Sequence, residues 1–149
     1  MKTFLLGMIL ALISTQTFAG DTGLVTTKSK FGFAETQQRL EAAIKAKGLT
    51  LFAKVDHGDN AAKAELKMNP AIVTLFGAAK GGTPFMLVAG SAGIDFPLKA
   101  LVWEDETKQV LVSYNSIDYV KARHAIKGLD ELSGKLNGLL AAIAKAATE

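Results

Sequence analysis

Two apolar runs joined by a short polar link stand out in the hydropathy pattern of the chain. The first run spans residues 97–105 and closes on Trp103-Glu104-Asp105; the second spans residues 110–115 and closes on Tyr114-Asn115. The link at 106–108 consists of Glu, Thr and Lys. Apolar runs of this length around a polar link predict a β-hairpin whose strands are largely buried.

The rest of the pattern mixes strand and helix signals. Apolar residues at helical spacing indicate a buried stripe in some segments, and short β-prone runs indicate strands in others. Capping residues and breakers set the expected ends of the helices. We expect strands at 24–27, 49–55 and 71–76, and helices at 33–47, 59–66 (capped by Asp59), 84–89 (after a Thr83 cap), 116–124 (capped by Ser116) and from 129 onward. The chain therefore predicts one domain in which strands and helices are mixed.

The first 19 residues predict a secretion signal peptide. Lys2 supplies a positive charge, and the apolar run at 4–13 is shorter than the about 20 residues that a membrane-spanning helix needs. Small or short residues end at Ala19, after which we expect cleavage. The predicted organisation is a signal peptide at 1–19 and a domain at 20–149, in a periplasmic or secreted protein with no membrane association after cleavage. An uncleaved N-terminal anchor is the alternative.

Composition narrows the classes of function. The chain contains no cysteine, which excludes disulfides and thiol chemistry. Loss of Lys2 with the signal would lower the formal net charge from +3 to +2. The lysines form no stripe with interleaved aromatic residues, so we expect no nucleic-acid partner.

Asp56-His57, at the end of an expected strand, is the first candidate for chemistry. An imidazole that titrates near neutral pH beside a carboxylate suits proton transfer. With Asp59, the same group offers ligands for a divalent metal. The alternative is ordinary turn composition, with Asp59 as a helix cap.

Three other polar features have structural explanations beside functional ones. The Gly-rich segment 77–82 could gather an anion on backbone N–H groups, yet it lacks the Gly-Lys-Ser/Thr ending of a phosphate-binding loop. Glu104 and Asp105 resemble an acid pair, although adjacent strand residues point to opposite faces. Arg123-His124 suits the end of a helix, where a cation complements the helix dipole.

The chain resembles the domain-of-unknown-function 302 (DUF302) family over about residues 29–143. The matching blocks are short and occur in one order along the chain. They are Glu35-Thr36, Lys47-Gly48-Leu49, Val55-Asp56-His57, Ala61-Ala62, Phe76-Gly77, Gly82-Thr83, Phe96-Pro97-Leu98-Lys99, Val102-Trp103-Glu104-Asp105, Ser113-Tyr114-Asn115 and Arg123-His124. Ala78-Ala79 stand where the family usually has Asn-Pro, which removes a side-chain amide from that loop.

The resemblance implies an α+β fold: a single two-layer domain with helices packed on a curved, mostly antiparallel sheet, often as a homodimer. It implies no established activity. It also favours one polar cluster that forms a ligand-binding site. The members of that cluster would be Asp56, His57, Trp103, Glu104, Tyr114, Asn115, Arg123 and His124.

Three functional hypotheses remain open at this point. The leading one is a non-enzymatic exported module that binds a small molecule or a partner, with no cofactor identified. The second is a hydrolase or isomerase in which Asp56 orients His57 as general base and Arg123 or His124 stabilises developing negative charge. The third is a metal-binding protein that uses His57, His124 and a carboxylate. The last two require the histidines to converge in space.

Overall fold

The computed structural model describes residues 22–149, so the expected signal peptide and its cleavage site after Ala19 lie outside the described residues. Within them, five strands form one sheet in the order β1-β5-β4-β3-β2, and every neighbouring pair is antiparallel. The strands are β1 (Leu24–Lys28), β2 (Thr50–Asp56), β3 (Ala71–Gly77), β4 (Leu98–Glu104) and β5 (Val110–Asn115). The predicted hairpin is confirmed as β4 and β5.

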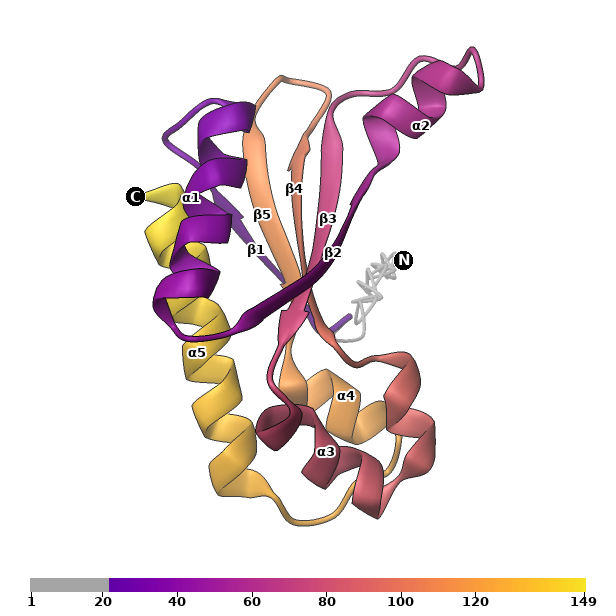
Figure 1. Cartoon of the computed structure of the whole chain (residues 1–149), viewed down its shortest axis with the longest axis vertical. Helices are drawn as coiled ribbons and strands as arrows, with labels where there is room; N and C mark the ends of the chain where they lie inside the picture. The colour runs from indigo at the N-terminus through magenta and orange to yellow at the C-terminus, as the bar shows by residue number, and fades with distance from the viewer. Residues whose placement is uncertain (1–21) are drawn as a thin grey trace, which may run out of the picture.

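Helices cover one face of the sheet, and other helices lie at both of its ends (Figure 1). α1 (Phe33–Ala46) and α5 (Asp130–Thr148) lie side by side on that face. α2 (His57–Lys63) stands at one end of the sheet, while α3 (Ala79–Val88), the 3₁₀ helix η1 (Gly90–Ile94) and α4 (Ile117–Arg123) gather at the other. The predicted α+β fold with two layers is confirmed.

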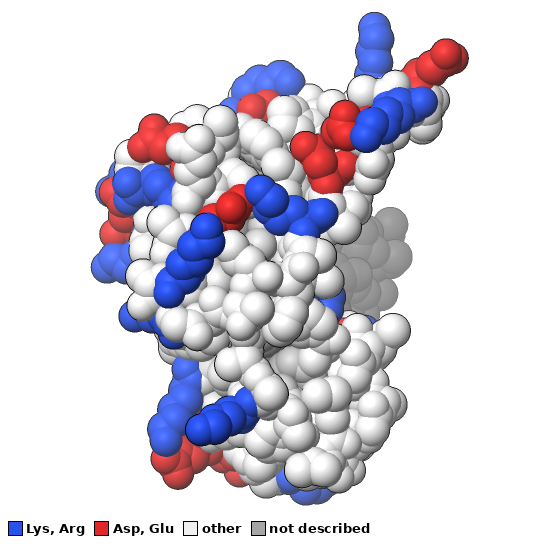
Figure 2. All heavy atoms as spheres, in the orientation of Figure 1, with Lys and Arg blue, Asp and Glu red and all other residues white. Residues whose placement is uncertain are grey.

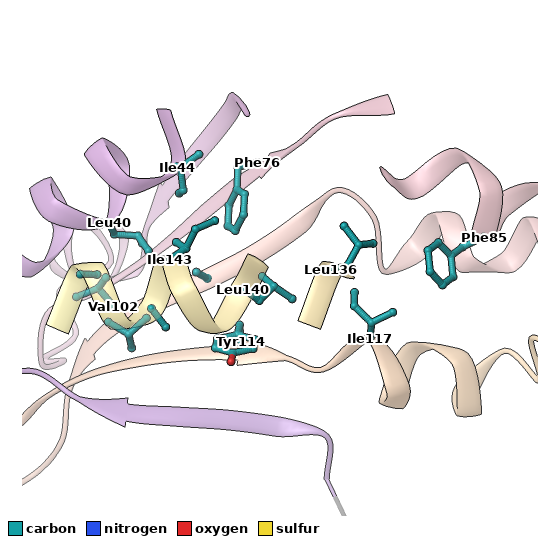
Figure 3. Packing of buried hydrophobic residues seen from close by; sticks show 14 of the residues in the cluster. Leu40, Ile44, Phe76, Phe85, Val102, Tyr114, Ile117, Leu136, Leu140 and Ile143 are labelled. Carbon is teal, nitrogen blue, oxygen red and sulfur yellow. The ribbon is translucent and has the colours of Figure 1, made fainter. Parts of the chain in front are cut away.

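The core lies between the sheet and the two long helices (Figure 3). Because strand side chains alternate between faces, every second residue of β3, β4 and β5 points at α1 and α5. Phe76, Val102 and Val112 are fully buried there, against Leu40 of α1 and Leu140 of α5. Burying a side chain of this size stabilises the fold by about 1.5–3 kcal/mol.

The opposite face of the sheet is not covered by any helix of the described residues. Leu101, Trp103 and Leu111 lie on it, one register position from the core residues Val102 and Val112. The Trp103 indole N–H donates to Ser113 Oγ at 2.9 Å, so the ring is held against the sheet. We call this surface the open face.

A β-bulge interrupts the pairing of the edge strand β2 with β3. Leu51 pairs with Phe76 and Ala53 with Leu75, so Phe52 is the extra residue. Extra residues of this kind bend a strand and change the direction of a side chain.

Two expected helix starts are wrong. α3 begins at Ala79 rather than at Pro84, which lies inside it. Gly82 therefore belongs to a helix and not to a loop; a Cβ at Gly82 would stand 2.9 Å from the Phe96 ring, so glycine is needed for that close approach. α2 begins at His57, and its cap is Asp56 instead of Asp59.

No helix in residues 22–149 has the length and hydropathy that crossing a membrane requires.

Candidate functional site

The structure places Asp56 and His57 at the end of the sheet that carries α2. Both side chains are exposed. Asp56 Oδ1 accepts a hydrogen bond from the backbone N–H of Asp59 at 2.9 Å, which caps the helix. Asp56 thus caps the helix, and no hydrogen bond or ion pair joins its carboxylate to the His57 ring in the described residues.

Trp103, Glu104 and Tyr114 lie in three different places on the sheet. Trp103 is on the open face. Glu104, at the α2 end of the sheet, faces Lys108 at 3.6 Å. Tyr114 points at the helices and is 7% exposed, and this burial raises the pKa of its hydroxyl.

Asn115, Arg123 and His124 lie at the other end of the sheet. Asn115 ends β5 and lines a small hollow with Asp95 and Lys99. Arg123 and His124 follow at the end of α4. The eight predicted residues are therefore not one cluster, and the hypothesis that His57 and His124 share a site is wrong.

The direction of the strands explains this outcome. His57 follows β2 and His124 follows β5 through α4, and three antiparallel pairings separate these strands. β2 and β5 therefore run in opposite directions and deliver their following residues to opposite ends. Strands of seven residues are about 23 Å long at about 3.3 Å per residue. No group of three His, Asp or Glu residues suited to a metal occurs among residues 22–149.

His124 instead belongs to a hydrogen-bonded array with Ser91 and Asp95. Its Nε2 lies 2.6 Å from Asp95 Oδ2, and its Nδ1 lies 2.9 Å from Ser91 Oγ. Arg123 Nη1 donates to the other oxygen of Asp95 at 3.2 Å. The side chains of His124 and Asp95 are 7% and 8% exposed, so the hydrogen bond between them is almost withdrawn from water, whereas Ser91 is exposed. We call Ser91, Asp95 and His124 the Ser91 array.

Lys99 adds a half-buried cation beside the Ser91 array. Its Nζ donates to the backbone oxygens of Asp95 at 2.8 Å and Pro97 at 3.1 Å. Burial lowers the pKa of Lys99, and the charge of Asp95 opposes that effect.

Sequence reasoning missed Ser91 and Asp95. They lie 33 and 29 positions from His124, in a segment that contained no motif beyond small residues at a helix end. The only sequence signal for this array was the polar pair Arg123-His124, whose side chains need polar partners.

A second feature missed from the sequence is an apolar cleft of about 310 Å³ at the same end of the molecule. Its walls come from the start of β2, from α3 and the segment before it, from the start of β4, and from α5. Figure 2 shows mostly uncharged surface over the α3 region, with charged side chains toward the α5 side. The lining residues are Leu49, Phe52, Gly77, Ala78, Ala79, Gly81, Gly82, Thr83, Met86, Phe96, Pro97, Leu98, Leu136 and Leu139.

The solved structure of an uncharacterized conserved protein DUF302 from Bacillus stearothermophilus shares this fold. It aligns with a TM-score of 0.76 over 85% of this chain and 98% of that chain, at 16% sequence identity. That likeness concerns the fold alone.

Curated relatives share more sequence over part of their length. The protein named fluoride-specific ion channel FluC 1 of Brucella suis biovar 1 (strain 1330) is 37% identical over 106 residues, which cover 71% of this chain and 42% of that protein. The FluC 1 protein of Brucella abortus biovar 1 (strain 9-941) is equally similar over 39% of its length. This chain spans about two fifths of these relatives.

The family comparison covers most of the chain. The family model described as "Domain of unknown function DUF302" matches residues 25–143, which include all five strands apart from Leu24, the helices α1 to α4 and most of α5. The chain belongs to the DUF302 family.

Proposed function

We propose that this chain is a binding module that holds a small apolar molecule in the cleft between β2, α3 and α5. The observation that carries the proposal is the cleft itself: a concave volume of about 310 Å³ with an almost wholly apolar lining. Ligand sites in proteins are typically concave, mostly apolar and about 300–1,000 Å³ in volume. The cleft is at the lower end of that range.

The volume indicates the size of the ligand. An engineered apolar cavity of about 150 Å³ holds one benzene molecule. The cleft has about twice that volume, so a molecule with two rings, or an aliphatic body of similar size, would fill it.

The lining also indicates the polarity of the ligand. Thr83 has the only side-chain hydroxyl among the lining residues, and none of them is charged. A charged group buried there would lose its hydration without a partner, which is costly. The buried part of the ligand is therefore neutral, and any charged group of the ligand projects into water.

A cavity-filling variant tests the proposal. Gly81 lies in α3, and a Cβ added there would meet Leu136 Cδ2 at 3.5 Å, an ordinary contact across the cleft. Gly81→Leu therefore places a larger side chain in the cleft. With 1-naphthylamine as a fluorescent two-ring probe, we expect saturable binding to the wild-type chain and at least about tenfold weaker binding to the variant, which corresponds to about 1.4 kcal/mol.

Gly134→Leu is the matched control. Gly134 lies in α5, and a Cβ there would meet nothing within 4 Å. Both variants replace a helical glycine by leucine and gain helix propensity, so only the filling of the cleft differs. Equal probe affinity in the two variants, or no saturable binding to the wild type, would refute the proposal.

Fluoride is a second candidate ligand, because the curated relatives carry the name of fluoride channels. The cleft does not favour it: a small, strongly hydrated anion needs charged or N–H donors in exchange for its water. We expect the fluorine NMR signal of sodium fluoride to be unchanged by the protein. A saturable change in that signal would favour fluoride over an apolar ligand.

Export and a homodimeric state remain proposals for this module. Cell fractionation with N-terminal sequencing of the recovered chain tests export, with a start at Gly20 as the expected result. Light scattering on the eluting protein tests the dimer.

A further inference from the structure

We propose that Ser91 is an activated nucleophile that accepts an acyl group from an activated ester, with His124 as its general base and Asp95 as the residue that orients His124. This activity is separate from ligand binding in the cleft. It rests on the Ser91 array, in which one imidazole joins the serine hydroxyl and the carboxylate.

The hydrogen bonds assign the proton on His124. An ionised carboxylate only accepts hydrogen bonds, so the nitrogen that faces Asp95, Nε2, carries the hydrogen. In the neutral imidazole, Nδ1 then presents its lone pair to Ser91, whose Oγ lies 2.9 Å away and can donate to it. This is the arrangement that a nucleophile needs from a base: the base accepts the hydroxyl proton, and a third group orients the base.

Burial distinguishes this array from a chance surface contact. His124 and Asp95 are almost entirely withdrawn from water, and the 2.6 Å contact between them is short. Arg123 donates to the second oxygen of Asp95, so both carboxylate oxygens are engaged and the carboxylate is held in place. Asp95 and Arg123 are positioning residues, because neither of them contacts Ser91.

The nucleophile itself is open to solvent. Ser91 is exposed in η1, where side chains three residues apart lie on the same side of a 3₁₀ helix. Ile94 is the residue three positions on, and it is 70% exposed. The array therefore lies beside an exposed apolar side chain, which favours esters with an apolar acyl group.

The acyl transfer forms one bond to carbon and breaks another. Ser91 Oγ forms a bond to the carbonyl carbon of the ester while its proton moves to His124 Nδ1. The tetrahedral adduct collapses, the carbon–oxygen bond to the leaving group breaks, and the leaving oxygen takes the proton from His124. The products are acyl-Ser91 and the free alcohol or phenol, and no oxidant or reductant is involved.

Backbone hydrogen bonding limits how fast the step runs. The N–H of the residue after a nucleophilic serine commonly stabilises the developing oxyanion. Here the N–H of Ala92 already donates to the backbone oxygen of Ala89 at 2.9 Å. Loss of one oxyanion donor costs about 100- to 1,000-fold in rate, so only esters with a good leaving group should react.

Acylation by p-nitrophenyl butyrate tests the proposal. We expect the intact chain to gain one butyryl group, with peptide mapping placing it on Ser91. Ser91→Ala should abolish that adduct, and His124→Gln should slow it at least about 100-fold, the lower end of the range for general-base catalysis. His57→Gln, which removes the exposed histidine at the far end, is the matched control and should react like the wild type. No adduct on Ser91, or an adduct that forms as fast in His124→Gln, would overturn the proposal.

A thiol at the same position gives an independent readout that does not depend on the ester. The natural chain has no cysteine, so Ser91→Cys introduces a single thiol. A neighbouring imidazole promotes the reactive thiolate, so iodoacetamide should alkylate this cysteine more than about tenfold faster than the exposed cysteine of Thr50→Cys. The combination of Ser91→Cys with His124→Gln should remove the difference. Equal rates for the two single-cysteine variants would contradict activation by His124.

Discussion

The Ser91 array predicts that burial, rather than distance, decides how much a hydrogen-bonded carboxylate stabilises this fold. Two pairs have the same 2.6 Å separation: Asp95 with His124, and Asp130 with Lys121. The Asp95 side chain is 8% exposed and the Asp130 side chain is 87% exposed. Asp95→Ala and Asp130→Ala therefore form a matched comparison.

The magnitude for Asp95→Ala follows from what the substitution leaves behind. His124 Nε2–H loses its acceptor in a site where its side chain is only 7% exposed. A buried donor without a partner costs about 1–3 kcal/mol, and a hydrogen bond to a charged group contributes about 1.5–3 kcal/mol. We expect the free energy of unfolding to fall by about 2–3 kcal/mol, whereas water replaces the exposed carboxylate in Asp130→Ala and the loss should be at most about 1 kcal/mol.

Urea unfolding measures both variants. With a slope of about 1–3 kcal/mol per molar urea, the expected loss in Asp95→Ala lowers the midpoint by about 0.7–3 M. Asp95→Asn keeps an oxygen that can accept from His124, so its loss should be smaller. Equal losses in Asp95→Ala and Asp130→Ala, at unchanged slope, would refute the reasoning.

Three further predictions concern single side chains. Burial lowers the pKa of Lys99 in the folded chain below its usual 10.5, although the charge of Asp95 opposes that effect. Between the pKa of Lys99 in the folded chain and its pKa in the unfolded chain, the unfolded chain binds more protons. The free energy of unfolding therefore rises with pH in that interval. Lys99→Met should lose that rise in urea unfolding measured up to pH 10.5. Gly82→Ala should lower the melting temperature, because its Cβ would lie 2.9 Å from the Phe96 ring; an unchanged melting temperature would show that the ring moves freely. Trp103 is the only tryptophan and lies on the open face, so ligand binding in the cleft should leave tryptophan emission unchanged, and a shift would place the ligand elsewhere.

Local signals predicted most elements of the fold. The hairpin was readable because its apolar runs and polar link are contiguous, and Ser116 was readable as a cap because it accepts from the N–H of Tyr119 three residues on. The start of α3 was not readable, since Gly82 serves the approach of Phe96 from fourteen positions away. A glycine required by a tertiary contact has the same appearance in a sequence as one required by a turn.

The candidate site was less predictable than the fold. Arg123-His124 was found as a polar pair, but its partner Asp95 lies 29 positions from His124 along the chain. His57 was assigned to the same site because both histidines follow elements that end at the sheet. Only the strand order decides that these ends are opposite, and strand order is a long-range property.

The bulge at Phe52 links the edge of the sheet to the cleft. If Phe52 paired with β3 as an ordinary strand residue, it would take Leu75 as its partner, and the pairing of the strand from Ala53 onward would shift by one. With it, Phe52 forms part of the cleft wall while Leu51 and Ala53 keep their partners. A relative that lacked this one residue would retain the sheet and lose an aromatic wall, so an insertion or deletion at an edge strand is a simple route by which such domains can change what they bind.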